Sequence, residues 1–253
     1  MGVVNVTPNS FSDGGRYLDH QDAVAHGLRL IAEGADLIDV GGESTRPHAE
    51  PVPADEQIRR VVPVVEQLAP HVRVSVDTRT AAVAEAAIAA GATLVNDVSA
   101  SLHEVAAAHG VGWVAMHMLG DPRTMQDDPR YDDVVTDVRD YLVERAETGR
   151  SAGVDEVWID PGIGFGKTLA HNLALLARLD ELVATGWPVL VATSRKRFLG
   201  TLLATSDRTD EVGTDDRLEG SLATATWAMA RGARMIRAHD VRPTAEAARI
   251  VAA

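Results

Sequence analysis

The chain alternates between two hydrophobic patterns along its length. Short runs rich in valine and isoleucine, apolar at odd and even positions alike, recur between Ala- and Leu-rich stretches whose apolar residues repeat every three or four positions. The first pattern is typical of parallel strands covered on both faces, and the second of amphipathic helices. There are eight such runs, and we expect strands at residues 2–6, 36–42, 72–78, 92–99, 111–117, 156–162, 188–194 and 233–240.

The stretches between these runs predict helices, for example at 22–35, 80–92 and 219–233. Several end in glycine just before the next strand, as helices commonly do. Strict alternation predicts a parallel α/β fold, and eight units in 253 residues is the count of a (β/α)8 TIM barrel. A doubly wound open sheet is the alternative, because periodicity alone does not separate the two folds.

No stretch rich in proline, glycine and serine divides the chain, so we expect one domain spanning residues 1–253. The polar, acidic stretch 204–218 is the most irregular part of the sequence, and we expect it to be a surface loop.

Composition narrows the function. The formal net charge is −13 and aromatic residues make up 4%, which disfavours nucleic acid as a partner. The chain has no cysteine, so it has no disulfide, thiol nucleophile or cysteine-based zinc site. No apolar run reaches the roughly 18 residues of a membrane span, and the first residues do not resemble a secretory signal. We therefore expect a cytoplasmic protein without a membrane partner.

Nearly every predicted strand ends in polar residues at its carboxyl side. In a (β/α)8 barrel these ends converge on one face, where active sites lie. Each pair has a simpler explanation, because Asp77-Thr78 or Asn96-Asp97 could merely cap the following helix. The three glycines of 160-DPGIGFGK-167 could likewise form only a tight turn. Helix capping does not explain why eight strand ends share this property.

The residue types suggest what such a face would bind. Two carboxylates, Asp77 and Asp160, with the amide of Asn96 and the amine of Lys196, could surround a flat heterocycle that has both donors and acceptors.

Local positive charge on this acidic chain comes from Arg46, Arg237 and His239, which suggests a ligand that carries phosphate. Asn5 offers an oxygen to Mg²⁺ held mainly through substrate phosphates and water. A Ser-His-Asp triad is not evident, because the chain has no G-x-S-x-G motif.

At these residues the chain resembles the dihydropteroate synthase family over essentially its whole length. Together the motifs are highly specific, although any one alone would be modest evidence. They are NVTPNSFSDGG (5–15), DVGGESTRP (39–47), VSVDT (74–78), VNDVS (95–99), MHM (116–118), DPGIGFGKT (160–168), SRKRFLG (194–200) and RAHDV (237–241).

The resemblance implies a (β/α)8 barrel, usually a homodimer, that requires Mg²⁺. Such an enzyme is a transferase of an alkyl group other than methyl. It condenses 6-hydroxymethyl-7,8-dihydropterin pyrophosphate with p-aminobenzoate to give 7,8-dihydropteroate and pyrophosphate for folate synthesis, and the family is the target of sulfonamides.

Matching the motifs residue by residue implies roles for named side chains. Five residues are expected to be catalytic as well as substrate-binding, namely Asp77, Asp160, Lys196, Arg237 and His239. The remaining substrate-binding residues implied are Phe11, Asp13, Thr45, Arg46, Pro47, Asn96, Phe165 and Arg197, and the metal contact implied is Asn5.

Within this set the resemblance implies that some residues bind the pterin and others bind the pyrophosphate. Asp77, Asn96, Asp160 and Lys196 would hold the pterin, while Asn5, Arg237 and His239 would hold the pyrophosphate.

The remaining implied residues belong to the second substrate and to the loops. Phe165 and Lys196 would wall the p-aminobenzoate, whose carboxylate would lie at the helix N-terminus near Arg197. Phe11 and Asp13 belong to one loop, and Thr45, Arg46 and Pro47 to a second, which would close over the site and exclude water.

Two other functions remain open at this point. A methyltetrahydrofolate–corrinoid methyltransferase would share the pterin-holding acids and amide but would lack GESTRP and SRKRFLG, and both are present here. A catalytically inactive paralogue that retains pterin binding would be expected to lose loop or phosphate residues, and the set is complete.

Overall fold

The computed structural model describes residues 1–6, 20–44, 50–207, 209–210 and 212–253. Strands form at all eight predicted positions, and each is shorter than its hydrophobic run. The strands are β1 (Gly2–Asn5), β2 (Leu37–Gly41), β3 (Arg73–Asp77), β4 (Leu94–Asp97), β5 (Gly112–Met116), β6 (Val157–Asp160), β7 (Leu190–Val191) and β8 (Met235–Ile236).

The strands close into a barrel. β1 to β6 pair in sequence order, β7 pairs with β8, and every pairing is parallel. Isolated bridges join Ile159 to Val189 and Gly2 to Ala238, so β6 continues into β7 and β8 returns to β1. The fold is therefore the predicted (β/α)8 barrel, and the open-sheet alternative is wrong.

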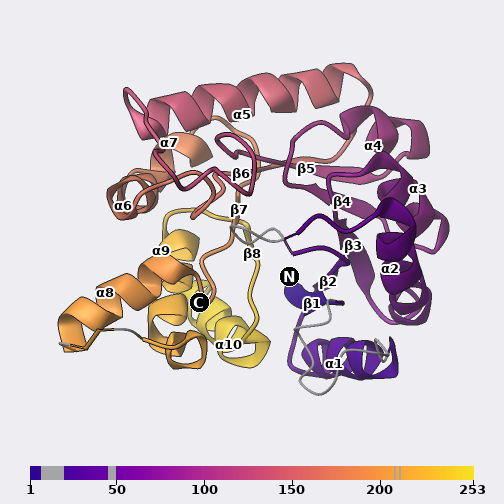
Figure 1. The fold of residues 1–253 in the computed structure, drawn as a ribbon, viewed down its shortest axis with the longest axis horizontal. Coiled ribbons are helices and arrows are strands. Elements are labelled where there is room, and N and C mark those ends of the chain that lie inside the picture. Colours follow the sequence, from indigo (N-terminus) through magenta and orange to yellow (C-terminus); the bar gives the residue numbers. More distant parts are fainter. Residues whose placement is uncertain (7–19, 45–49, 208, 211) are drawn as a thin grey trace.

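Helices surround the strands on the outside (Figure 1). They are α1 (His20–Ala32), α2 (Ala54–Leu68), α3 (Ala81–Ala89), α4 (His103–His109), α5 (Val134–Ser151), α6 (Leu169–Ala177), α7 (Leu179–Val183), α8 (Arg197–Asp207), α9 (Leu218–Ala230) and α10 (Val241–Val251), with a short 3-10 helix η1 (Thr214–Asp216). Two of the glycines expected at helix ends, Gly91 and Gly232, have φ of 114° and 98°, which side chains rarely allow.

The acidic stretch 204–218 is more regular than the sequence suggests. Its first residues, up to Asp207, complete the last turn of α8, and residues 214–216 form η1. The side chain of Arg217 orders the stretch further, because its Nε and Nη2 donate to the carbonyl of Val212 at 3.2 and 2.8 Å. The expected surface loop is therefore shorter than 204–218, because its first residues belong to α8 and residues 214–216 form η1.

The barrel interior changes from apolar to polar along the strands. Alternate residues of a strand share a face, so each strand sends every second side chain inward. Leu37 and Leu94, which belong to one buried apolar cluster, are followed two residues later by Asp39 and Asn96, both almost fully buried. Polar groups therefore collect toward the carboxyl ends of the strands. In the part of the chain that the structure describes, no helix is long and apolar enough to cross a membrane.

Candidate active site

A network of buried charges lies on the floor of the polar end of the barrel. Arg237, just after β8, donates from Nε to Asp39 Oδ2 at 2.6 Å and from Nη2 to Asp77 Oδ2 at 2.8 Å. Asn96 Nδ2 donates to the same Asp39 oxygen at 2.9 Å. Residues from β2, β3, β4 and β8 are thus brought together, as the convergence of strand ends predicts.

Asp39 is the member of this network that sequence reasoning missed. Its side chain is completely buried, and its Oδ1 has no hydrogen-bond partner among the described residues. A buried, unpaired carboxylate oxygen is costly, so its presence is typical of a functional position. The available signal was an acid inside the apolar run DLIDV, at an inward-facing position of its strand.

Asp77 and Asp97, the two acids that could have been helix caps, differ in what they contact. Asp97 does hold the chain that follows it, because Oδ2 accepts from the backbone N–H groups of Ser101 and Leu102, each at 2.6 Å, and from Trp113 Nε1 at 3.1 Å. Asp77 does not cap α3 but points to Arg237. Asn96, beside Asp97, also turns inward, so local hydrogen bonding to the chain before α4 accounts for Asp97 but not for Asp77 or Asn96.

Asp160 and the glycines after it form one compact turn. Asp160 is 3% exposed, and its Oδ1 accepts from the N–H of Gly162 at 2.7 Å. Gly162 has φ of 63°, and a Cβ there would lie 1.8 Å from the carbonyl oxygen of His117. Gly166 has φ of 61°, and a Cβ there would lie 2.7 Å from the carbonyl oxygen of Leu119. These glycines allow the loop after β6 to pack directly on the loop after β5.

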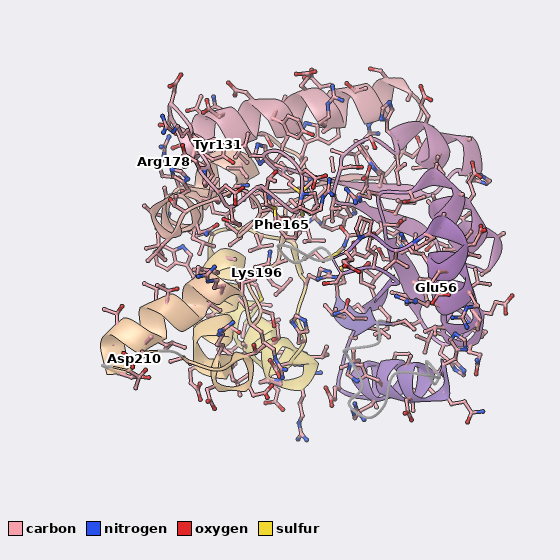
Figure 2. All side chains as sticks on the ribbon, viewed as in Figure 1. Glu56, Tyr131, Phe165, Arg178, Lys196 and Asp210 are labelled. Atoms are coloured by element: carbon pink, nitrogen blue, oxygen red, sulfur yellow. The ribbon has the colours of Figure 1, made fainter. Side chains whose placement is uncertain are left out.

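This turn presents Phe165 to Lys196. The Lys196 ammonium lies 4.8 Å from the centre of the Phe165 ring and donates to the carbonyl of Ile163. Figure 2 shows the two side chains next to each other near the middle of the molecule, on segments that follow β6 and β7. A cation over a ring face is attractive, so the contact fixes both side chains.

A second lysine, Lys167, was not predicted as a functional residue. Its Nζ is 2.9 Å from Nδ1 of His117 and 3.0 Å from the carbonyl of Phe165, and the lysine is 3% exposed. Both groups are buried, and burial lowers the pKa of Lys167 to about 7 and that of His117 to about 3. The Lys167 amine joins the Phe165 loop to His117, which follows β5.

The remaining described residues lie around the rim. His239 donates its N–H to Ser194 Oγ at 3.1 Å, and its Nδ1 lies 3.1 Å from the same oxygen. Arg197 is exposed and is the first residue of α8, as expected. Gly41 pairs with Asn5 of β1 and with Asp77 of β3, and a Cβ built on it would lie 3.6 Å from Asn5 Oδ1 and 3.7 Å from Asp77 Oδ2.

Comparisons with known proteins agree on one family. Residues 1–239 match the family model described as pterin binding enzyme. Dihydropteroate synthase of Escherichia coli K12 is 46% identical over 261 residues, covering 100% of this chain and 90% of the relative, and that of Mycobacterium leprae is 48% identical over 262 residues, covering 100% and 92%. The chain belongs to the dihydropteroate synthase family.

Solved structures of the family have the same fold. The Yersinia pestis dihydropteroate synthase in a sulfonamide complex superposes with a TM-score of 0.90 at 45% identity, covering 99% of this chain and 91% of that one. The Xanthomonas albilineans dihydropteroate synthase in complex with 7,8-dihydropteroate gives 0.86 at 44% identity, covering 98% and 90%.

Burial sets the charge state of the groups on the site floor of this dihydropteroate synthase family member. It raises the pKa of Asp77 to about 7, although the neighbouring Arg237 acts in the opposite direction. It also raises the pKa of Asp160, and it lowers that of Lys196 to about 8. Burial alone would lower the pKa of Arg237, but Asp39 and Asp77 raise it, so this guanidinium stays charged.

Five of the residues that the family motifs imply lie outside the described part of the chain. These are Phe11, Asp13, Thr45, Arg46 and Pro47. The roles of all the implied site residues remain predictions, which the proximity of the described ones supports.

Proposed function

We propose that this protein is a dihydropteroate synthase that joins 6-hydroxymethyl-7,8-dihydropterin pyrophosphate to p-aminobenzoate, releasing 7,8-dihydropteroate and pyrophosphate. The observation that carries the proposal is the buried set formed by Asp39, Asp77, Asn96 and Arg237, with Asp160 and Lys196 beside it. Carboxylates and an amide suit the amino and ring N–H edge of a pterin, and an ammonium suits its ring carbonyl.

The reaction breaks the bond between the pterin methylene carbon and a pyrophosphate oxygen. The electron pair leaves with pyrophosphate, and positive charge develops on the methylene and the electron-rich ring. Asp77 and Asp160 stabilise this charge from the barrel floor. The p-aminobenzoate nitrogen then forms the new C–N bond and loses one proton to solvent. An arylamine is already a free base at neutral pH, so the step needs no strong general base.

The departing anion requires positive charge. Arg237 and His239, adjacent in space to the end of β7, bind the pyrophosphate, and Arg237 reaches it from its anchorage on Asp39 and Asp77. The p-aminobenzoate lies against Phe165 and Lys196, with its carboxylate near the first N–H groups of α8 at Arg197.

We also propose that Mg²⁺ takes part, held by Asn5 together with the substrate pyrophosphate and water. The described residues contain no group of three or more His, Asp or Glu side chains that could hold a metal by themselves. A single side-chain oxygen at the end of β1, close to Gly41, suits a cation that is bound mainly through phosphates. When bound, the metal supplies charge that stabilises pyrophosphate as it leaves.

Two further proposals rest mainly on the family. The enzyme is a homodimer that works in the cytoplasm. The exposed apolar side chains of Leu173 on α6 and Trp227 on α9, 40% and 45% exposed, support a subunit contact on these adjacent helices. Light scattering of the purified protein tests the dimer, and Trp227→Glu should shift it toward monomer.

A coupling assay tests the proposed reaction. The purified protein is incubated with the pterin pyrophosphate and p-aminobenzoate, with and without Mg²⁺, and 7,8-dihydropteroate is measured. Formation of dihydropteroate that depends on Mg²⁺ is expected, and Asp160→Asn should weaken pterin binding in a calorimetric titration. A folded protein that binds the pterin but forms no product would instead be an inactive paralogue.

A further inference from the structure

The segments that follow β7 and β8 carry Lys196 and His239, and they are joined by side-chain contacts. The last backbone hydrogen bond between these two segments, among the described residues, runs from Arg237 N to Val191 O at 3.0 Å. Beyond it Ser194 contacts His239. One residue further, Arg195 donates to Asp240 from Nε to Oδ2 at 2.9 Å and from Nη2 to Oδ1 at 2.7 Å. The two site residues are thus flanked by a bidentate ion pair.

Asp240 pairs with Arg195 and does not cap the helix that follows it. It precedes α10 at the N-cap position, where an aspartate usually accepts from the first N–H groups of the helix. Its side chain makes no such hydrogen bond within the described chain, and both of its oxygens accept from Arg195 instead. A requirement of helix α10 alone therefore does not account for this aspartate.

Arg195 has an unusual backbone conformation that its neighbours maintain. Its φ is 60°, in the left-handed region that residues other than glycine seldom adopt. Its N–H donates to Ser221 Oγ at 2.9 Å, and its carbonyl accepts from Arg217 Nη1 at 3.0 Å. Strained backbone persists only where surrounding contacts fix it, and it is concentrated at functional sites. Here it sets the turn that leads directly into Lys196.

We propose that Arg195 and Asp240 are positioning residues that hold Lys196 and His239 in one fixed arrangement. Arg195 precedes Lys196, and Asp240 follows His239, so the pair joins the pterin-binding end of β7 to the pyrophosphate-binding end of β8. A bidentate guanidinium–carboxylate pair is directional as well as strong. The side chains are 31% and 20% exposed, so solvent screens this pair less than a pair on the open surface. The inference rests on the proposed function.

Two conservative variants test the pair. Arg195→Lys keeps the charge but loses the planar fork, and Asp240→Asn keeps the shape but loses the charge. Each should lower kcat/KM for the pterin pyrophosphate by about 10- to 100-fold at a temperature where thermal unfolding shows the variant to be folded. Calorimetry with inorganic pyrophosphate and Mg²⁺ should show weaker binding in both variants. Arg178→Lys is the matched control, because Arg178 also pairs with carboxylates, Asp133 and Glu181, but on the outside of the barrel (Figure 2).

Exchanging the charges of Arg195 and Asp240 distinguishes a positioning role of the pair from a general loss of structure in the variants. The double variant Arg195→Asp with Asp240→Arg restores an ion pair of reversed polarity, and aspartate tolerates a left-handed conformation better than most residues. The kcat/KM of the double variant should be at least several-fold higher than that of Arg195→Asp alone or of Asp240→Arg alone.

The proposal is wrong if the folded single variants keep wild-type kcat/KM and pyrophosphate affinity. It is equally wrong if the fold-loss of kcat/KM in the double variant equals the product of the fold-losses in Arg195→Asp and Asp240→Arg. Failure of the proposed function is distinguishable, because the wild-type protein would then form no dihydropteroate. In that case amide hydrogen exchange still tests the pair. If Arg195 and Asp240 position these segments, exchange at residues 194–197 and 239–241 should be faster in both Arg195→Lys and Asp240→Asn than in the wild type.

Discussion

Arg237 and Asp39 are hydrogen-bonded across the floor of the barrel, Nε to Oδ2, at 2.6 Å. Asp39 lies on β2 and is completely buried, while Arg237 follows β8 and also reaches Asp77. One guanidinium thus bridges two acids that would otherwise repel each other. The pair orients Arg237 before any ligand arrives, which reduces what binding must organise.

Replacing Asp39 should damage both stability and binding. In Asp39→Asn the buried guanidinium keeps one acid only, and removing one partner of a buried pair costs about 3–5 kcal/mol of unfolding free energy. The KM for the pterin pyrophosphate should also rise, because Arg237 loses one of the two carboxylates that orient it. Urea unfolding and steady-state kinetics measure the two effects. Asp180→Asn is the control, since its pair with Arg231 is solvent-exposed and should contribute less than about 1 kcal/mol. Equal stability of the two variants would contradict the assigned role.

The pH dependence of the reaction should be bell-shaped. The carboxylate of Asp77 forms as pH rises through about 7, and the ammonium of Lys196 is lost as pH rises through about 8. We therefore expect kcat/KM for the pterin pyrophosphate to be highest between about pH 7 and pH 8 and to fall on both sides. Asp77→Asn should weaken the acidic limb, leaving the part that comes from Asp160, while lowering the maximum. Because pyrophosphate itself titrates, the same profile should be measured by calorimetry with the pterin alcohol, and a flat profile there would refute the assignment.

The sequence predicted most of the fold because hydrophobic period and strand count are local properties. It also located Asp77, Asn96 and Asp160, since polar groups at the ends of apolar runs stand out. Asp39 did not stand out, because it lies within such a run and only its inward register identifies it. The Arg195–Asp240 pair was hidden for another reason, since its members are 45 positions apart and meet only when the barrel closes.

Lys167 should destabilise the folded protein less and less as the solution becomes alkaline. Its pKa is lowered to about 7 in the folded protein from 10.5, so between these values the folded state holds fewer protons than the unfolded chain. Unfolding free energy then rises with pH across this window. Lys167→Met should show a smaller rise between pH 7 and pH 9 in urea unfolding, with the part that remains coming from Lys196. An unchanged slope would mean that Lys167 titrates normally.

The Phe165 ring should determine affinity for p-aminobenzoate more than for the pterin pyrophosphate. It lies over the Lys196 ammonium at 4.8 Å and is carried by a loop that Lys167 anchors. Phe165→Leu keeps an apolar side chain but removes the flat face, so the KM for p-aminobenzoate should rise about 10-fold, equivalent to about 1.4 kcal/mol. The KM for the pterin pyrophosphate should change less than about 3-fold. Phe198→Leu is the matched control, because it removes the same ring from the core beneath α8 and should lower stability without separating the two constants. Equal increases of both KM values in Phe165→Leu would place the ring against the pterin instead.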